Sequence, residues 1–297
     1  MTGQTQVRDG AVWLVTGSSR GLGRALAEAV LASGDRLVAT ALPSEMERLK
    51  PLACFGDRVR TFALDVRDPE AAQAAVDAAV AAFGRLDVVV NNAGYGDVGS
   101  IEDTELAAIR AQVETNLFGT IHVTKAALPQ LRRQGSGRFI QFSSIAGRVA
   151  PAGRGAYAAA KWGVEGFSEA LAREVAPLGL QVTIVEPGGF RTDFAGASTT
   201  FREPQPAYAG TVGRSIAYQR EYDGRQPGDP RKAAEALLTI ARAAAPPLRL
   251  VLGSDAYGFA KANEDDRARE LEAWRALSLS TDFEADPGEV DLNQRRQ

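Results

Sequence analysis

The sequence of 297 residues contains a single cysteine, Cys54, and a single histidine, His122. One cysteine excludes an internal disulfide and any zinc or iron–sulfur site built from several cysteines. One histidine excludes a histidine-rich metal site, and a Ser-His-Asp triad would depend on His122 alone. We therefore predict no bound metal and assign no function to Cys54 or His122.

The sequence also lacks a surplus of either charge and lacks long apolar runs. The 34 Lys and Arg against 37 Asp and Glu leave a net charge of −3, which argues against a nucleic-acid partner. No run reaches the roughly 18 apolar residues of a membrane span. The first ten residues are polar and lack the apolar stretch of a signal peptide. We expect a soluble, cytoplasmic protein without membrane or nucleic-acid partners.

Short apolar runs alternate with helical patterns about seven times along the chain. This alternation predicts an α/β fold, a single doubly wound Rossmann-like domain whose parallel sheet of about seven strands has helices on both faces. Such a sheet binds ligands beyond the carboxyl ends of its strands. Strands are predicted at 11–16, 36–41, 59–64, 86–90, 138–143, 181–186 and 248–252, and helices at 22–31, 45–53, 69–83, 105–131, 154–176, 230–244 and 261–277.

We predict a polar tail over residues 1–10, one Rossmann-like domain over 11–279 and a second polar tail over 280–297. Within the domain, segment 194–229 is long and weakly periodic, as functional lids often are. Its charges balance, so the lid places no evident charge demand on a substrate. Its aromatic residues indicate an apolar pocket, or simply pack the lid onto the core; they are Phe194, Phe201, Tyr208, Tyr218 and Tyr222.

A glycine-rich turn, TGSSRGLG, runs from Thr16 to Gly23 between the first predicted strand and helix. Glycines permit a tight turn and let the backbone approach a phosphate closely. The helix N-terminus then offers free N–H groups and a positive dipole end to a pyrophosphate. A purely structural turn is the alternative.

The spacing TGxxxGxG resembles that of the short-chain dehydrogenase/reductase family, in its single-domain branch. Further motifs follow in the family's order, densely from residue 11 to 192 and more loosely near Leu250. They are Asp65 after the third strand, NNAG at 91–94, Asn116, Ser143-Ser144, YxxxK at Tyr157 and Lys161, and Pro187-Gly188 with Thr192. The resemblance implies an NAD(P)-dependent dehydrogenase/reductase, of the carbonyl reductase or alcohol dehydrogenase type, acting on a small molecule.

The resemblance also implies a set of cofactor-binding residues. Asp65 matches the residue that contacts the adenine ring. Asn91 has a second interpretation, as a structural bridge between central strands. The whole set is Gly17, Ser19, Arg20, Gly21, Leu22, Gly23, Asp65, Val66, Asn91, Ala93, Gly94, Tyr157, Lys161, Pro187, Gly188 and Thr192.

Four residues form the implied catalytic set: Asn116, Ser144, Tyr157 and Lys161. Hydride transfer to a carbonyl leaves an alkoxide that needs a proton and a hydrogen-bond donor. Tyr157 and Lys161 are four residues apart on a predicted helix, so a cation on the same face can lower the tyrosine pKa. Ser144, spaced as the family's serine, would orient the substrate oxygen. In the family, the residue matching Asn116 holds a water that links the lysine to solvent.

The second predicted strand ends without the Asp or Glu that binds the ribose 2′-hydroxyl of NAD. Arg20 stands where family members that use NADP often carry a basic residue, and it could clamp a 2′-phosphate. Leu42 departs from the pattern, because such members commonly have arginine there. We therefore favour NADP(H) and keep NAD(H) as the alternative.

The reaction predicted is hydride transfer between the nicotinamide and a carbonyl or secondary alcohol of a mid-sized, mostly apolar substrate. The alternatives are a non-catalytic dinucleotide-binding regulator, or an epimerase or tailoring enzyme of a biosynthetic pathway. We also predict a homo-oligomer, a dimer or tetramer, with segment 280–297 held against the body or a neighbour. Its interface would use small residues of the two long helices, namely Ala107, Ala108, Gly119, Ala126, Ala158, Ala159, Gly163 and Gly166.

Overall fold

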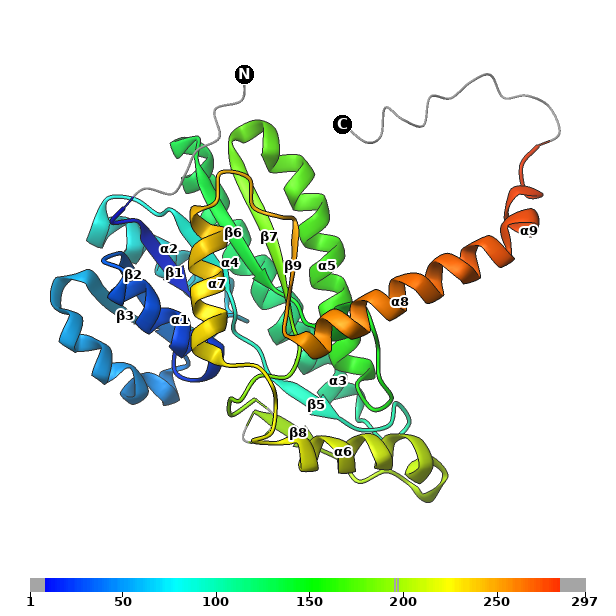
Figure 1. Cartoon of the computed structure of the whole chain (residues 1–297). Coiled ribbons are helices and arrows are strands. Elements are labelled where there is room, and N and C mark those ends of the chain that lie inside the picture. Colours follow the sequence, from blue (N-terminus) through cyan, green and yellow to red (C-terminus); the bar gives the residue numbers. More distant parts are fainter. Residues whose placement is uncertain (1–8, 195, 197, 284–297) are drawn as a thin grey trace. The chain divides into compact units, whose positions relative to one another are not determined.

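Seven parallel strands form the central sheet of the computed structural model, which describes residues 9–194, 196 and 198–283 (Figure 1). Their spatial order reverses direction after β1, as the prediction of a doubly wound sheet requires. The predicted number of strands and their parallel pairing are confirmed. In order across the sheet they are β3 (Val59–Ala63), β2 (Arg36–Ala41), β1 (Val12–Val15), β4 (Val88–Asn91), β6 (Gly137–Phe142), β7 (Leu180–Pro187) and β9 (Arg249–Leu252).

Helices cover both faces of this sheet (Figure 1). Successive side chains of a strand point to opposite faces, so Trp13 and Val15 of β1 enter one apolar cluster and Val12 and Leu14 enter the other. The first cluster packs under α1 (Gly21–Ala32) and α7 (Pro230–Arg242). The second packs under α2 (Pro69–Phe83), α4 (Gly119–Gln134) and α5 (Gly155–Val175).

Local sequence sets the ends of the predicted helices. Asp68 caps α2 by accepting hydrogen bonds from the backbone N–H groups of Glu70 and Ala71, at 2.9 and 3.2 Å. Proline occupies the first helical position, and Gly84 ends the helix in the left-handed conformation with φ 77°. These signals lie in neighbouring residues, which is why the predicted bounds of α2 match the observed ones.

The long helix predicted at 105–131 contains an irregular turn. It consists of α3 (Leu106–Val113), a π-helical turn over Glu114–Phe118, and α4. π-turns are frequent at functional sites because they redirect side chains without ending the helix. The helix predicted at 45–53 is instead a run of 3-10 turns over Pro43–Arg58, interrupted at Gly56.

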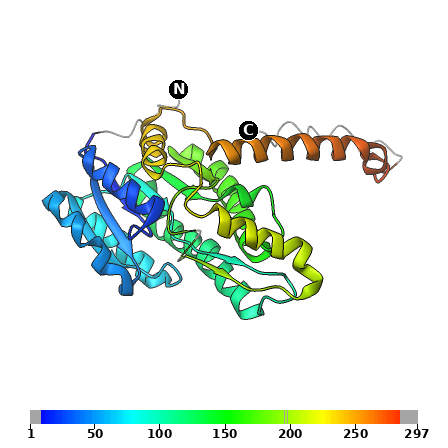
Figure 2. The same cartoon turned by 60° about the horizontal axis from the view of Figure 1, so that its bottom comes forward.

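Three elements in and around the predicted lid were missed. β5 (Gly96–Val98) and β8 (Thr199–Phe201) form a separate two-stranded parallel sheet, and α6 (Arg214–Tyr222) follows. Three-residue strands rich in glycine and threonine carry no detectable alternation. Figures 1 and 2 both show β5, β8 and α6 gathered at one end of the molecule.

The described chain divides after Ala260 into two units. The first holds the whole sheet, and the second begins at Lys261 within α8 (Ser254–Ala273) and contains α9 (Arg275–Leu279). α8 begins at Ser254 instead of 261. The domain bounds 11–279 stay a prediction, and most of the two predicted tails, 1–8 and 284–297, lies outside the described residues. Over the described ranges, no helix is long and apolar enough to cross a bilayer, and no cluster of potential metal ligands is found.

Short helical turns complete the connections of the described chain. They are η3 (Ile145–Gly147), η4 (Ala176–Leu178), η5 (Pro206–Tyr208) and the π-turn η6 (Ala209–Gly213).

Candidate active site

The glycine-rich turn joins β1 to α1 with its backbone closely packed. Gly17 has φ +69°, and a Cβ on Gly23 would overlap the carbonyl oxygen of Gly17, so both positions require glycine. Among the described residues, no side chain caps the N-terminus of α1. Its first N–H groups are therefore available to a phosphate, as the motif predicts.

A cavity of about 820 Å³ opens at the carboxyl ends of the central strands. Its lining includes three of the four predicted catalytic residues, Ser144, Tyr157 and Lys161, and every predicted cofactor residue but one. Asn91 and Asn116 are the two predicted site residues that do not line it. The sheet thus brings together residues from segments 17–23, 64–67, 92–95, 143–161 and 187–194.

Asn91 lies below the cavity, where it bridges the central strands. Its amide donates to Gln141 of β6 at 2.7 Å and to Thr124 of α4 at 3.0 Å. The neighbouring Asn92 lines the cavity and donates at 2.9 Å to the backbone oxygen of Thr16, beside the glycine turn. The structural interpretation of Asn91 therefore fits its contacts, and Asn92 is a lining residue that the sequence analysis missed.

Asn116 is fully buried in the π-turn and holds the backbone of Tyr95, a residue that lines the cavity. Its amide donates to the Tyr95 carbonyl at 3.1 Å, and its side-chain oxygen accepts from the Tyr95 N–H at 3.2 Å. A Cβ on Gly94 would overlap this side-chain oxygen, so glycine is needed there. Asn116 therefore acts on the shape of the NNAG segment through backbone contacts.

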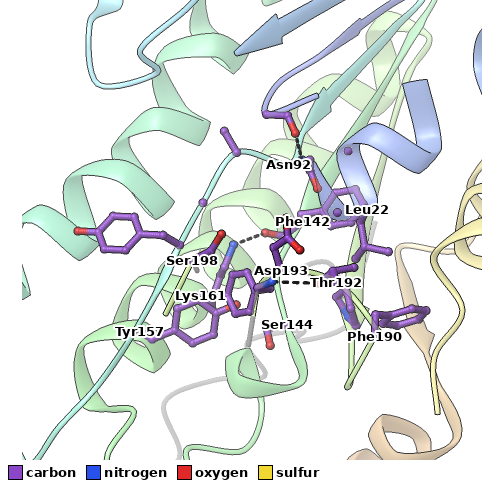
Figure 3. Close-up of a pocket in the computed structure, with 18 of the residues that line it drawn as sticks. Leu22, Asn92, Phe142, Ser144, Tyr157, Lys161, Phe190, Thr192, Asp193 and Ser198 are labelled. Atoms are coloured by element: carbon purple, nitrogen blue, oxygen red, sulfur yellow. Dashed lines mark hydrogen bonds between the residues drawn. The ribbon is translucent and has the colours of Figure 1, made fainter. Parts of the chain in front are cut away.

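Tyr157 and Lys161 stand one helical turn apart on α5, both buried, with the lysine Nζ 5.8 Å from the centre of the tyrosine ring. Lys161 donates to the Phe142 carbonyl at 2.7 Å, at the end of β6 (Figure 3). Burial lowers the pKa of Lys161 to about 8, opposed by the charge of Glu165. An ammonium this desolvated gains much from an added hydrogen-bond acceptor such as a ribose hydroxyl.

Burial, one nearby charge and one hydrogen bond set the protonation of Tyr157. Burial raises the pKa of its phenol, whereas the positive charge of Arg154 and a hydrogen bond with Ser144 lower it. Ser144 caps η3, its hydroxyl accepting from the Ala146 N–H at 3.1 Å. Ser143 is buried, and its hydroxyl faces the α5 backbone. Ser144 is thus the serine placed beside Tyr157, in agreement with the spacing argument.

Two ion pairs lie at the end of the cavity beside the glycine turn. Arg20 donates to Glu45 at 2.5 Å, and the hydroxyl of Ser19 donates to the other oxygen of the same carboxylate at 2.6 Å. Asp65 pairs with Arg67 at 2.5 Å, and this hydrogen bond lowers the pKa of Asp65. Glu45 was missed because it lies beyond the strand end, in the 3-10 turns where the motif specifies no residue.

The lid contributes only part of its aromatic residues to the cavity. Phe194, Tyr218 and Tyr222 line it. Phe201 and Tyr208 instead pack against a small apolar cluster of Val98, Val212 and Ile216, which agrees with the packing interpretation for those two.

Arg154 lines the cavity beside Tyr157, and Gln219 lines it beside Arg154; the sequence analysis missed both. Arg154 stands three residues before Tyr157, so the helical i, i+3 rule was the signal that could have found it. Gln219 lies on α6, for which the sequence offers no comparable signal.

Two buried carboxylates, Glu165 and Glu186, lie next to the segment that follows Ser144. Glu186, at the end of β7, is fully buried and pairs with Arg148 at 2.8 Å. Glu165 of α5 pairs with Arg249 of β9 at 3.0 Å, and Arg249 is also 3.6 Å from Glu186. Burial and the nearby Glu165 raise the pKa of Glu186 to about 7.

The chain is similar to known short chain dehydrogenases in sequence and in structure. The family model of short chain dehydrogenases matches residues 11–203. An oxidoreductase of Botryotinia fuckeliana named BOA17 is 44% identical over 272 residues, 91% of this chain and 98% of that protein. A 3-ketodihydrosphingosine reductase of Bacteroides thetaiotaomicron is 34% identical, over 81% of this chain and 87% of that protein. The crystal structure of a short-chain dehydrogenase from Streptomyces avermitilis has a TM-score of 0.86 at 43% identity, covering 93% of this chain and all of that one.

The family match and the oxidoreductase relatives, together with the parallel doubly wound sheet, identify an oxidoreductase that uses a nicotinamide dinucleotide. The chain belongs to the short-chain dehydrogenase/reductase family. It is an NAD(P)-dependent enzyme of that family and acts on a small molecule.

Proposed function

We propose that the enzyme transfers a hydride between NADP(H) and a carbonyl or secondary alcohol of a mid-sized, mostly apolar substrate. The observation that carries this proposal is the convergence of Ser144, Tyr157 and Lys161 on one cavity, which the glycine turn also lines. A non-catalytic regulator would not need a buried proton donor beside a buried lysine.

In this proposal the nicotinamide supplies the hydride, and the chain supplies the proton and the orientation. Ser144 donates a hydrogen bond to the carbonyl oxygen and holds it near the Tyr157 hydroxyl. Tyr157 donates its proton as negative charge develops on that oxygen. Lys161 stabilises the tyrosinate that remains. Asn116 keeps the Tyr95 backbone in place, and the tyrosinate regains its proton from solvent by way of the Lys161 ammonium.

The residues present fit a dinucleotide. The N-terminus of α1, which no side chain caps, suits a pyrophosphate. Because Gly17 and Gly23 have no side chains, a pyrophosphate could approach the backbone of the turn closely. For NADP(H), the 2′-phosphate would take the place of Glu45 as the partner of Arg20. Glu45 keeps NAD(H) as the alternative, since its carboxylate could instead accept a hydrogen bond from a ribose hydroxyl.

Two named relatives support reduction of a ketone as the reaction type. One is the 3-ketodihydrosphingosine reductase, and another is a 3-oxoacyl-[acyl-carrier-protein] reductase of Vibrio cholerae, 34% identical over 78% of this chain. The aromatic residues Phe194, Tyr218 and Tyr222 suit an apolar substrate body. An epimerase or tailoring enzyme on the same fold remains the alternative outcome.

A panel of ketones, each offered with NADPH and with NADH, tests the proposal. We expect stoichiometric cofactor oxidation and alcohol formation with at least one apolar ketone. Tight cofactor binding without turnover of any carbonyl compound would support the regulator instead, and product isomerisation without net cofactor oxidation would support the epimerase. The cytoplasmic location and homo-oligomeric state stay predictions.

A further inference from the structure

A guanidinium lies at the substrate end of the cavity, beside the proposed proton donor. Arg154, the residue before α5, lines the cavity with its guanidinium carbon 5.4 Å from the centre of the Tyr157 ring. Its Nη2 donates to the side-chain oxygen of Gln219, on α6 of the lid. Within the described ranges, this neutral amide is its hydrogen-bonded side-chain partner.

The charge of Arg154 is not balanced locally. Two acidic groups act on it: Tyr157, whose phenol is neutral at pH 7 because burial raises its pKa, and Asp97 of β5, which is buried and already pairs with Arg202 at 3.2 Å. One carboxylate between two guanidiniums leaves one positive charge in excess. Desolvation lowers the pKa of Arg154, as expected for a cation with too little counter-charge. A free arginine in water would not incur this cost.

The contact with Gln219 is of a kind that a ligand can displace. An amide oxygen is a neutral acceptor, whereas a carboxylate carries a full negative charge and can accept two parallel N–H bonds from a guanidinium. The cavity lining also includes the aromatic residues Phe194, Tyr218 and Tyr222. An apolar body with one anionic group would therefore match the lining better than a wholly apolar ketone.

We propose that Arg154 binds a carboxylate of the substrate, so that the enzyme acts on oxo acids, or the matching hydroxy acids, whose carboxylate lies a few bonds from the reacting carbon. This inference rests on the proposed function and narrows its substrate class. Because only one unit of positive charge is in excess, a monoanionic carboxylate fits better than a dianionic phosphate. Arg154 then holds the acid group while Tyr157 and Ser144 face the ketone.

The test compares a series of 3-oxo acids of increasing chain length with their methyl esters, which keep the ketone and lose the charge. With the unaltered enzyme we expect kcat/KM about tenfold or more higher for the acid than for its ester. In Arg154→Gln, kcat/KM for the acid should fall by about 10- to 100-fold, mainly through KM, and that for the ester by far less. Arg154→Lys should restore part of the preference for the acid.

A matched control is Arg214→Gln on α6, the lid helix that carries Gln219. It removes an exposed charge from a residue that does not line the cavity. It should leave the acid-to-ester ratio unchanged. The ratio also separates binding from an effect of Arg154 on the Tyr157 pKa, because the latter changes kcat for both substrates alike. Equal kcat/KM for acid and ester, or equal losses in Arg154→Gln, would overturn the inference while the proposed function stands. No oxidation of either cofactor with any carbonyl compound would instead refute the proposed function.

Discussion

Arg20 and Glu45 form an ion pair of 2.5 Å at the end of the cavity beside the glycine turn, and Ser19 donates to the same carboxylate. The basic residue of the glycine turn thus has an acidic partner 25 positions later in the chain. A 2′-phosphate competes with Glu45 for this guanidinium, whereas a 2′-hydroxyl does not.

The choice of cofactor should therefore respond in opposite directions to changes at these two residues. Arg20→Ala should weaken NADP(H) about tenfold or more and NAD(H) much less, since a charge-assisted hydrogen bond is lost. Glu45→Gln should strengthen NADP(H), because repulsion of the phosphate is removed. Fluorescence titration with both reduced cofactors measures this. Equal changes for both cofactors would mean that neither residue contacts the 2′ position.

Tyr157→Phe should remove the transferable proton and keep the ring in place. We expect kcat to fall by roughly 100-fold or more, the scale of general-acid catalysis. Cofactor Kd should change little, because the packing of the ring against Phe194 is preserved. Steady-state kinetics with titration of the cofactor checks both parts, and turnover close to that of the unaltered enzyme would contradict the assignment.

Lys161→Ala should impair two steps at once. The buried ammonium is placed to stabilise the tyrosinate and to bind the ribose, so kcat should fall and cofactor Kd should rise, each by about tenfold or more. Lys125→Ala, on the exposed side of α4, is the matched control and should be silent. A loss of kcat with unchanged cofactor Kd would remove the ribose contact from the proposal.

Glu186 should make the folded protein less stable as pH rises, whereas a carboxylate whose pKa is lowered on folding makes it more stable. Its pKa is about 7 in the folded protein against 4.5 for a free glutamate. Between these values the folded state binds more protons than the unfolded state, so the free energy of unfolding falls as pH rises toward 7. Glu186→Gln should remove up to roughly 3 kcal/mol of this decline.

Urea unfolding at pH 4.5 and above pH 7 measures the Glu186 effect. Exposed Glu174 offers a matched control, and Glu174→Gln should leave the pH dependence as it is. If Glu186→Gln and the parent protein show the same dependence, the charge of Glu186 is compensated at all pH values by Arg148 and Arg249.

The predicted oligomer has a test on α5. Gly119 and Gly163 contact Val66 and Leu117 of the same chain, so these small residues already serve packing inside it. Gly166 is exposed, with open space where a Cβ would stand. Gly166→Arg should leave the fold intact and weaken a two-fold contact between α5 helices by about tenfold or more.

Light scattering gives the mass for comparison with 31.5 kDa per chain. Ala82→Arg, at an exposed position of α2, controls for the added charge and should not change the mass of the assembly. A parent protein of 31.5 kDa would contradict the oligomer. Truncation after Leu279 tests the predicted role of segment 280–297, of which residues 284–297 lie outside the described part of the chain.

From the sequence alone, the parallel sheet could be predicted, along with the bounds of helices such as α2 and the pairing of Tyr157 with Lys161. These features depend on neighbouring residues: alternating apolar runs, a capping Asp68 with its proline, and an i, i+4 spacing. Ser144 was chosen over Ser143 because its spacing to Tyr157 is that of the family's serine.

Tertiary structure alone decided which distant residues meet. Glu45 reaches Arg20 through 3-10 turns, Asn116 reaches Tyr95 through a π-turn, and Gln219 reaches Arg154 from the lid helix. None of these contacts follows from a period or a motif, because each depends on how separate segments pack across the ends of the sheet. The charges that we propose to select the cofactor and the substrate arise in those contacts, so they became visible only in the folded chain.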